Sequence, residues 1–319
     1  MHNQIFNQSQ KIMNNAQAQL QQLTGLHLKT SSTGSHLPGA PKLSAQPAGQ
    51  VPPVVNSPLI NPLVQLFNNR KHLAEVASSP IPAVIAAMLA QPVAYFMENP
   101  SDADEGQAPL THVAFVLDDS GSMAYGKEAT VEGFNSQVLV VKEGAKLAGE
   151  TTFTDVRFNS VVALRTVAGN IANIQELTSS TYSPSGGTAL YDALGETIAA
   201  LLGTKGINSP KTAILVTAFT DGDENASRVY SVAMVKALIE RLEATGRWTF
   251  ALVGPAQSVT GLAGQLAVNL DNIAGYDVTS IAGKQEAFGK AAGASASYMS
   301  MRSMGITSSA SLYSMPGSQ

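Results

Sequence analysis

Two apolar runs stand out along the chain, and each ends abruptly in polar residues. Val113–Leu117 leads into Asp118, and Ala213–Phe219 leads into Thr220 and Asp221. Short apolar runs without alternation are typical of strands that are buried on both faces of a parallel sheet. We therefore predict two central strands. Ligands of open α/β sheets lie at the carboxyl ends of such strands, so the polar residues there are candidates for a site.

Helical and strand patterns alternate around these two runs. Glu128–Ala148 is predicted to be a helix because its apolar residues recur at helical spacing. Two β-rich segments around Phe158–Ser160 predict a hairpin. Alternating units imply an α/β fold, Rossmann-like and doubly wound, with a mostly parallel central sheet, helices on both faces and the hairpin strand as an antiparallel edge. The remaining predicted strands are Thr151–Arg157, Val161–Arg165, Thr249–Val253 and one near Tyr276–Val278, and the remaining helices are Ala189–Leu202, Ala226–Thr245, Val259–Val268 and Gln285–Ala292.

The segments that flank the main domain differ from it in composition. Residues 1–29 are rich in Gln and Asn but carry an apolar stripe, which favours an amphipathic arm over a disordered polar tract. Residues 30–62 read as a Pro-rich linker and residues 63–106 as a helical extension, so the fold gains a helical or extended N-terminal arm. We place the main domain at residues 107–293. The Ser- and Met-rich tail, residues 294–319, is expected to be disordered in isolation or to add a strand to a neighbour.

The composition narrows the classes of function. A chain of 319 residues with 44% hydrophobic residues can bury a sizeable core. The absence of cysteine excludes disulfides, thiolate zinc sites and cysteine nucleophiles. A net charge of -4 argues against broad nucleic-acid binding.

Charge and hydropathy also bear on partners and location. The first 74 residues contain five basic residues and no acidic one, so we expect the arm to dock on an acidic surface of another copy or another protein. The longest apolar stretch, Ile81–Met97, is short and interrupted by proline, and we expect no membrane span. No basic region followed by an apolar run opens the chain, so we expect a cytoplasmic protein or a component of a virion or other large assembly.

The polar residues after the first central strand suggest a metal site. Asp118, Ser120 and Ser122 alternate, and an extended backbone would put their side chains on one side. A carboxylate and two hydroxyls form a hard oxygen site that suits Mg²⁺, Mn²⁺ or Ca²⁺ rather than zinc. The alternative is ordinary turn chemistry with a helix N-cap.

Two later stretches extend this pattern. Thr188 lies where the Gly-rich loop Ser185–Thr188 enters a predicted helix, and Asp221 follows the second central strand. With these two residues, the chain resembles the von Willebrand factor A (VWA) family, including its bacterial and phage members, from about Leu110 to Met299. The residues that match the metal-ion-dependent adhesion site of that family, in order, are Asp118, Ser120, Ser122, Thr188 and Asp221.

The resemblance implies a role for each of these residues. Ser120 and Ser122 would bind the metal directly, Thr188 would do so in a high-affinity state, and Asp118 and Asp221 would act largely through water. Because neutral hydroxyls and waters leave the cation much of its positive field, the expected ligand is an Asp or Glu carboxylate of a partner protein. Mg²⁺ usually keeps several waters, which fits a site completed from outside.

The residues beside the pattern have structural interpretations. Gly222 would let the backbone swing away after Asp221, or it is a plain turn glycine. Asp223 and Glu224 are expected to cap the helix that follows rather than to bind metal. Asp119 is expected to be a solvated charge on the rim, and both aspartates of the pattern are expected on surface loops.

Three classes of function follow from the sequence. The first is a divalent-metal-dependent protein-binding module. The second is a structural component of a larger assembly such as a phage particle, with the fold as a docking block, and the third is a partner subunit of an AAA+ ATPase. We expect no enzyme: Asp118 with Asp221 and Asp223 would suit a metal centre for phosphoryl transfer, but no Walker sequence and no paired general base accompany them. His112 opens a strand and is expected to be structural.

Overall fold

The computed structural model of this chain describes residues 82–90, 109–307 and 311–314. The predicted arm (1–29) and linker (30–62) lie outside the described residues. Helix α4 (Ala83–Ala90) falls within the predicted helical extension. Among the residues described, every helix is too short or too polar to cross a bilayer.

Six strands form a single sheet in the order β3-β2-β1-β4-β5-β6. Neighbouring strands are parallel except for β2 and β3, which pair as an antiparallel hairpin at one edge. The predicted α/β class and its antiparallel edge are therefore confirmed. The strands are β1 (Leu110–Asp118), β2 (Glu150–Phe158), β3 (Val162–Asn170), β4 (Thr212–Phe219), β5 (Trp248–Pro255) and β6 (Ile273–Tyr276).

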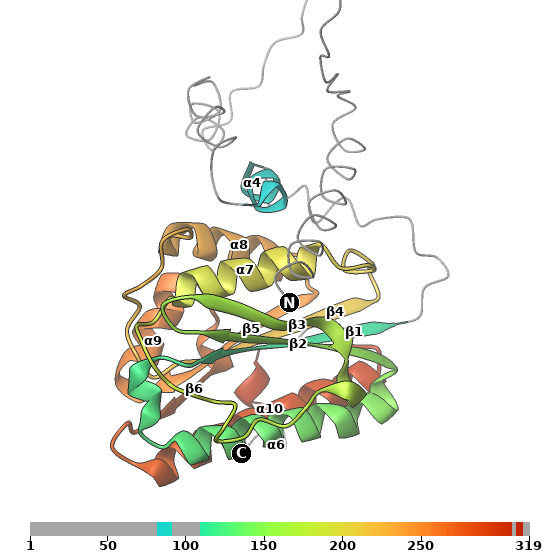
Figure 1. The fold of residues 1–319 in the computed structure, drawn as a ribbon. Helices are drawn as coiled ribbons and strands as arrows, with labels where there is room; N and C mark the ends of the chain where they lie inside the picture. The colour runs from blue at the N-terminus through green and yellow to red at the C-terminus, as the bar shows by residue number, and fades with distance from the viewer. Residues whose placement is uncertain (1–81, 91–108, 308–310, 315–319) are drawn as a thin grey trace, which may run out of the picture. The chain divides into compact units, whose positions relative to one another are not determined.

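Helices cover both faces of the sheet (Figure 1). One core contains α7 (Leu190–Leu202), α8 (Val232–Ala244) and α9 (Ala256–Leu266), and the other contains α6 (Lys127–Ala148) and α10 (Ile281–Ser303). Strand β1 contributes side chains to both cores. Ala114 and Val116 pack into the first core, and the alternate residues Val113, Phe115 and Leu117 pack into the second. A strand with two buried faces needs apolar residues at every position, which explains the unbroken run in the sequence.

Two predicted helices differ from the structure. Helix α8 begins at Val232 rather than Ala226, with Ser231 as its N-cap, since Ser231 accepts a hydrogen bond from the Met234 amide. Helix α10 begins before Gln285 and continues through Ser303. The other elements are confirmed, with ends that shift by a few residues. Short 3-10 helices complete the described fold: η2 (Gly121–Ala124), η3 (Ile171–Asn173), η4 (Leu270–Asn272) and η5 (Leu312–Ser314).

The extension of α10 overturns the prediction of a disordered tail from Ala294, as far as Ser303. Tyr298, Met299 and Arg302 are buried in this part of the helix. The Arg302 guanidinium donates to Thr111 Oγ1 at 3.1 Å and to the Lys211 carbonyl at 3.0 Å, so the end of the helix is fixed to the sheet. The stripe that α10 buries includes Lys284, Ser295 and Arg302 among its apolar residues, and such a mixture does not stand out as a core face in the hydrophobic pattern.

The order of the strands reverses between β1 and β4, at the middle of the sheet. From β1 the chain moves through α6 to β2 on one side, and it later returns through α7 to β4 on the other side. Ligands of open α/β sheets bind at the point where the strand order reverses, beside the carboxyl ends of the strands. In this chain those ends carry Asp118 and the Thr220-Asp221 pair.

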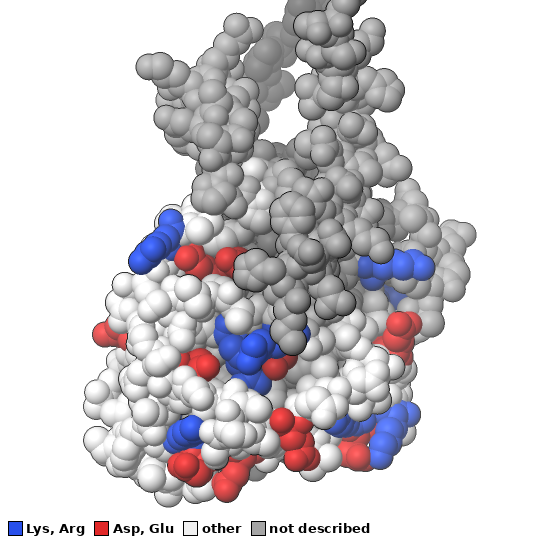
Figure 2. All heavy atoms as spheres, viewed as in Figure 1, with Lys and Arg blue, Asp and Glu red and all other residues white. Residues whose placement is uncertain are grey.

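On the face seen in Figure 2, the charged side chains of the described residues are mixed in sign. Lys and Arg alternate with Asp and Glu over this face, and neither sign gathers into a continuous patch there.

Candidate metal centre

Asp118 is the last residue of β1, and its side chain is fully buried. Its Oδ1 accepts a hydrogen bond from the Ser120 amide at 2.7 Å, and its Oδ2 accepts one from Thr220 Oγ1 at 2.6 Å. Burial raises the pKa of the Asp118 carboxyl, while these hydrogen bonds oppose the rise. The Tyr182 hydroxyl also donates to the Asp118 carbonyl at 2.6 Å. Asp118 therefore organises the loop from within the fold, and its predicted place on a surface loop is wrong.

The two serines link Asp118 to Asp221. Ser120 Oγ lies 3.1 Å from Ser122 Oγ, and Ser122 Oγ donates to Asp221 Oδ1 at 2.6 Å. The Asp221 side chain is 9% exposed, so it too is largely withdrawn from solvent. Four of the predicted residues thus form one connected group of oxygens.

Thr188 is brought to this group by loop contacts on both sides. On one side, Gly121 N donates to the Gly186 carbonyl at 3.0 Å. On the other, Thr188 N donates to Asn225 Oδ1 at 2.9 Å, and Asn225 N returns a 3.0 Å bond to the Thr188 carbonyl. These bonds fix the Thr188 backbone between the loops that carry Ser120 and Asp221.

Gly222 shows that the Thr188 and Ser122 hydroxyls face the same small space. A methyl group on Gly222 would lie 3.2 Å from Thr188 Oγ1 and 3.4 Å from Ser122 Oγ. The φ angle of Gly222 is not in the left-handed region, so its backbone does not require glycine. Glycine is required here because any side chain would fill the space between the Thr188 and Ser122 hydroxyls. We call this space, which is lined by hydroxyl oxygens, the cradle.

The residues present fit a small, hard divalent cation. Hydroxyl and carboxylate oxygens are the ligand types that suit Mg²⁺, Mn²⁺ or Ca²⁺. Within the part of the chain that is described, no group of three or more His, Cys, Asp or Glu is arranged to hold a metal. A cation at this centre would therefore be bound by hydroxyls and waters as much as by carboxylates, unlike zinc in a histidine or thiolate site.

Three residues that the sequence analysis did not assign also build the centre. Thr220 holds Asp118, Asn225 holds Thr188, and Lys284 from α10 reaches Asp221. Thr220 and Asn225 lie within the motif around Asp221, which is a local signal. Lys284 is distant in sequence, and no local pattern marks it.

The acidic residues beside the centre have structural roles. Glu224 accepts hydrogen bonds from the amides of Ala226, Ser227 and Tyr191, and from Ser227 Oγ. Asp192 accepts from three further amides, those of residues 228–230. The prediction that Glu224 caps the helix that follows is wrong: α8 begins at Val232, and Glu224 binds amides of the preceding loop and of Tyr191 at the start of α7.

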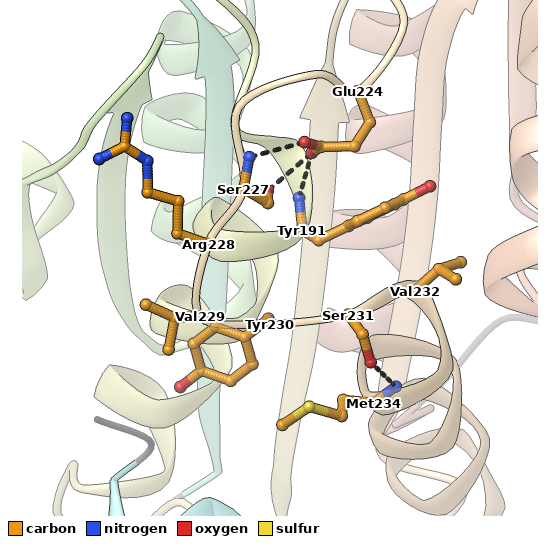
Figure 3. A pocket seen from close by; sticks show the side chains of 9 residues that line it. All are labelled: Tyr191, Glu224, Ser227, Arg228, Val229, Tyr230, Ser231, Val232 and Met234. Carbon is orange, nitrogen blue, oxygen red and sulfur yellow. Dashed lines mark hydrogen bonds between the residues drawn. The ribbon is translucent and has the colours of Figure 1, made fainter. Parts of the chain in front are cut away.

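Figure 3 shows the shallow pocket that this loop lines, with the Glu224 carboxylate bonded to Ser227 and to the Tyr191 amide. The Glu224 and Ser227 side chains of this lining are therefore engaged with the protein itself.

Asp119 is not the solvated charge that was expected. It is half-buried, and its Oδ1 is buried without a hydrogen-bond partner. Burial raises the pKa of Asp119, and Arg157, Arg165 and Lys127 oppose the rise.

Comparisons with known proteins find similarity of structure and not of sequence. No protein-family model matches the chain, and no curated protein matches its sequence. Among solved structures, the PilB minor pilin from Streptococcus sanguinis is similar with a TM-score of 0.42 and 14% identity, over 64% of each chain.

Two further solved structures are similar over a comparable share of this chain. A von Willebrand factor type A protein from Catenulispora acidiphila has a TM-score of 0.38 and 15% identity, over 60% of this chain and 43% of that one. The pilus adhesin SpaC from Lactobacillus rhamnosus GG has a TM-score of 0.41 and 13% identity, over 63% of this chain and 30% of that one. The match spans less than two thirds of each of these three proteins.

Proposed function

We propose that this chain is a VWA-type protein-binding module whose centre holds a divalent cation, Mg²⁺ in the first instance. The observation that carries the proposal is the convergence of Asp118, Ser120, Ser122, Thr188 and Asp221 on one cradle, which Gly222 leaves open. Ser120, Ser122 and Thr188 would provide neutral oxygens. Asp221 would orient the Ser122 hydroxyl, and Asp118 would fix the loop through the Ser120 amide and Thr220 Oγ1.

The protein partner follows from the chemistry of this ligand set. A cation bound mainly by hydroxyls and water retains much of its charge and attracts an anionic oxygen. A carboxylate from an Asp or Glu on a partner surface is the matching group. The proposal is therefore adhesion or assembly through a metal-bridged carboxylate, without catalysis by this chain.

The first test is calorimetry with Mg²⁺ on the full chain and on Asp221→Asn. This variant keeps the shape of the side chain but removes the charge that orients Ser122, so Mg²⁺ affinity should fall roughly 10- to 100-fold, as it does when groups that orient metal ligands are lost. Asp118→Asn should act in the same direction. Glu240→Gln, which neutralises an exposed carboxylate on α8, is the matched control and should leave the affinity unchanged. Equal affinity in all four proteins would contradict the metal centre.

The second arm of this experiment uses the same proteins as bait in extracts of the source, with Mg²⁺ or with EDTA. The full chain should retain a partner in Mg²⁺ and release it in EDTA, and Asp221→Asn should not retain it. A partner that stays bound in EDTA would favour the docking-block alternative, in which the fold joins an assembly without metal.

A further inference from the structure

Lys284 places an ammonium group beside the metal centre. It lies in the first turn of α10, and its side chain is 3% exposed. Its Nζ donates to the Tyr125 carbonyl at 2.9 Å and lies 3.6 Å from Asp221 Oδ2. Lys284 thus connects three segments: α10, the loop after β1 and the loop after β4.

The position of this side chain is fixed by packing. A methyl group on Gly126 would lie 3.4 Å from Lys284 Cδ, so the aliphatic stem runs against the Gly126 backbone. Nζ also lies 5.7 Å from the centre of the Tyr276 ring, within the range of a cation–π interaction. By contrast, Lys290 on the same helix is exposed and pairs with Glu286 one turn away.

A buried ammonium is costly unless an anion compensates for it. Burial lowers the pKa of Lys284, and Asp221 opposes this effect. Asp221 is the carboxylate that the structure pairs with this charge, and its other oxygen accepts from Ser122. The carboxylate that orients a metal-binding hydroxyl is therefore shared with a cation that belongs to the protein.

We propose that Lys284 is a positioning residue that holds Asp221 in place and lowers the affinity of the centre for Mg²⁺. This inference rests on the proposed function. Before metal binds, Lys284 offsets part of the repulsion between Asp118 and Asp221. After metal binds, the same charge opposes the cation, and it adds to the positive field that an acidic partner meets. We therefore expect the centre to bind metal weakly by itself. It should bind metal more tightly when a partner carboxylate is also bound, because the carboxylate offsets both positive charges.

The test compares Mg²⁺ affinity by calorimetry in the full chain, Lys284→Met and Lys284→Gln. Both variants remove the positive charge, and the second keeps a donor for the Tyr125 carbonyl. Because the variants remove a positive charge that would lie a few ångströms from the divalent cation, each should bind Mg²⁺ at least about tenfold more tightly than the full chain. Lys290→Met, which removes an exposed charge from the same helix, should bind like the full chain.

The sign of the change separates this proposal from a purely structural role. If Lys284 only stabilised the loops, its loss would weaken Mg²⁺ binding, so weaker or unchanged affinity in a folded variant would overturn the proposal. Circular dichroism establishes folding, and Lys284→Gln is the variant to use should Lys284→Met unfold. If the full chain and both variants bind no Mg²⁺, the proposed function itself fails. If the full chain binds and the variants bind no better, only the role of Lys284 fails.

Discussion

At the scale of single residues, the proposed metal centre depends on the missing side chain of Gly222 as much as on the side chains around it. Gly222 faces Thr188 Oγ1 and Ser122 Oγ across the cradle, and no other residue type leaves that space open. The sequence predicts a turn glycine at this position. Its φ angle does not require glycine, so the requirement is the absence of a Cβ atom and not the backbone conformation.

Gly222→Ala should weaken Mg²⁺ binding roughly tenfold, as an altered ligand orientation does, and should leave the fold intact. The added methyl group would press on both hydroxyls at 3.2–3.4 Å, while the φ angle accommodates alanine. Calorimetry measures the affinity and thermal denaturation measures the stability. Gly261→Ala is the matched control, since a methyl group there meets nothing within 4 Å. If Gly222→Ala binds Mg²⁺ like the control, the cradle is not the metal site.

At the scale of elements, α6 and α10 pack closely against each other. The two helices lie side by side on one face of the sheet (Figure 1). Glycines on α6 make room for large side chains of α10: a methyl group on Gly133 would lie 2.2 Å from Phe288 Cγ, and one on Gly144 would lie 2.5 Å from Met299 Cβ. Gln137 adds a buried hydrogen bond to the Phe288 carbonyl at 3.1 Å.

Gly133→Ala should destabilise the protein by about 1–3 kcal/mol, because overpacking outweighs the gain in helix propensity. Gly289→Ala on α10 is the matched control without overpacking, because a methyl group there meets nothing within 4 Å. It should stabilise the protein by about 0.5–1 kcal/mol through helix propensity alone. Urea denaturation of both variants gives the two free energies of unfolding. Equal effects of the two substitutions would show that the helices are packed more loosely than described.

At the scale of the whole molecule, stability should depend on pH through His112. This side chain is buried in β1 and forms a hydrogen bond through Nδ1 with Thr152 Oγ1 on β2. Burial lowers the pKa of His112 from 6.5 to about 4. Between these two values the unfolded chain binds a proton that the folded chain does not. The contribution of neutral His112 to the free energy of unfolding is therefore complete above pH 6.5, and it is lost as the pH falls toward about 4.

The shift corresponds to about 3 kcal/mol of folding free energy. Glu196 acts in the opposite sense, because burial and Asp192 raise its pKa to about 7, so its contribution decreases as the pH rises. Glu196 is present in both the full chain and His112→Gln, so its effect cancels when the free energy of unfolding of one is subtracted from that of the other. Urea denaturation should show that, between pH 7.5 and pH 4, the full chain loses about 3 kcal/mol more unfolding free energy than His112→Gln does. Parallel stability curves for the two proteins would exclude His112 as the titrating group.

The sequence predicted the sheet better than it predicted the surroundings of the site. The apolar runs before Asp118 and Asp221 identify strands because full burial on two faces leaves a pattern in adjacent residues. The start of α8 was misplaced since Glu224 and Asp192 bind the amides that a helix would otherwise use. Lys284 was missed because its role arises from a contact between distant segments, and a lone lysine near the start of a helix carries no local sign of it.

The oxygens of the centre come from three segments of the chain: residues 118–122, Thr188 and Asp221. An unfolded chain does not bring them together, so a cation held here binds the native state alone. The free energy of binding then adds to the free energy of unfolding. At a free Mg²⁺ concentration 100 times the dissociation constant, the native state is stabilised by about 2.7 kcal/mol. Chelation would lower the melting temperature as well as release a partner. The concentration of Mg²⁺ in the surroundings would thereby set the temperature at which half of the molecules are unfolded.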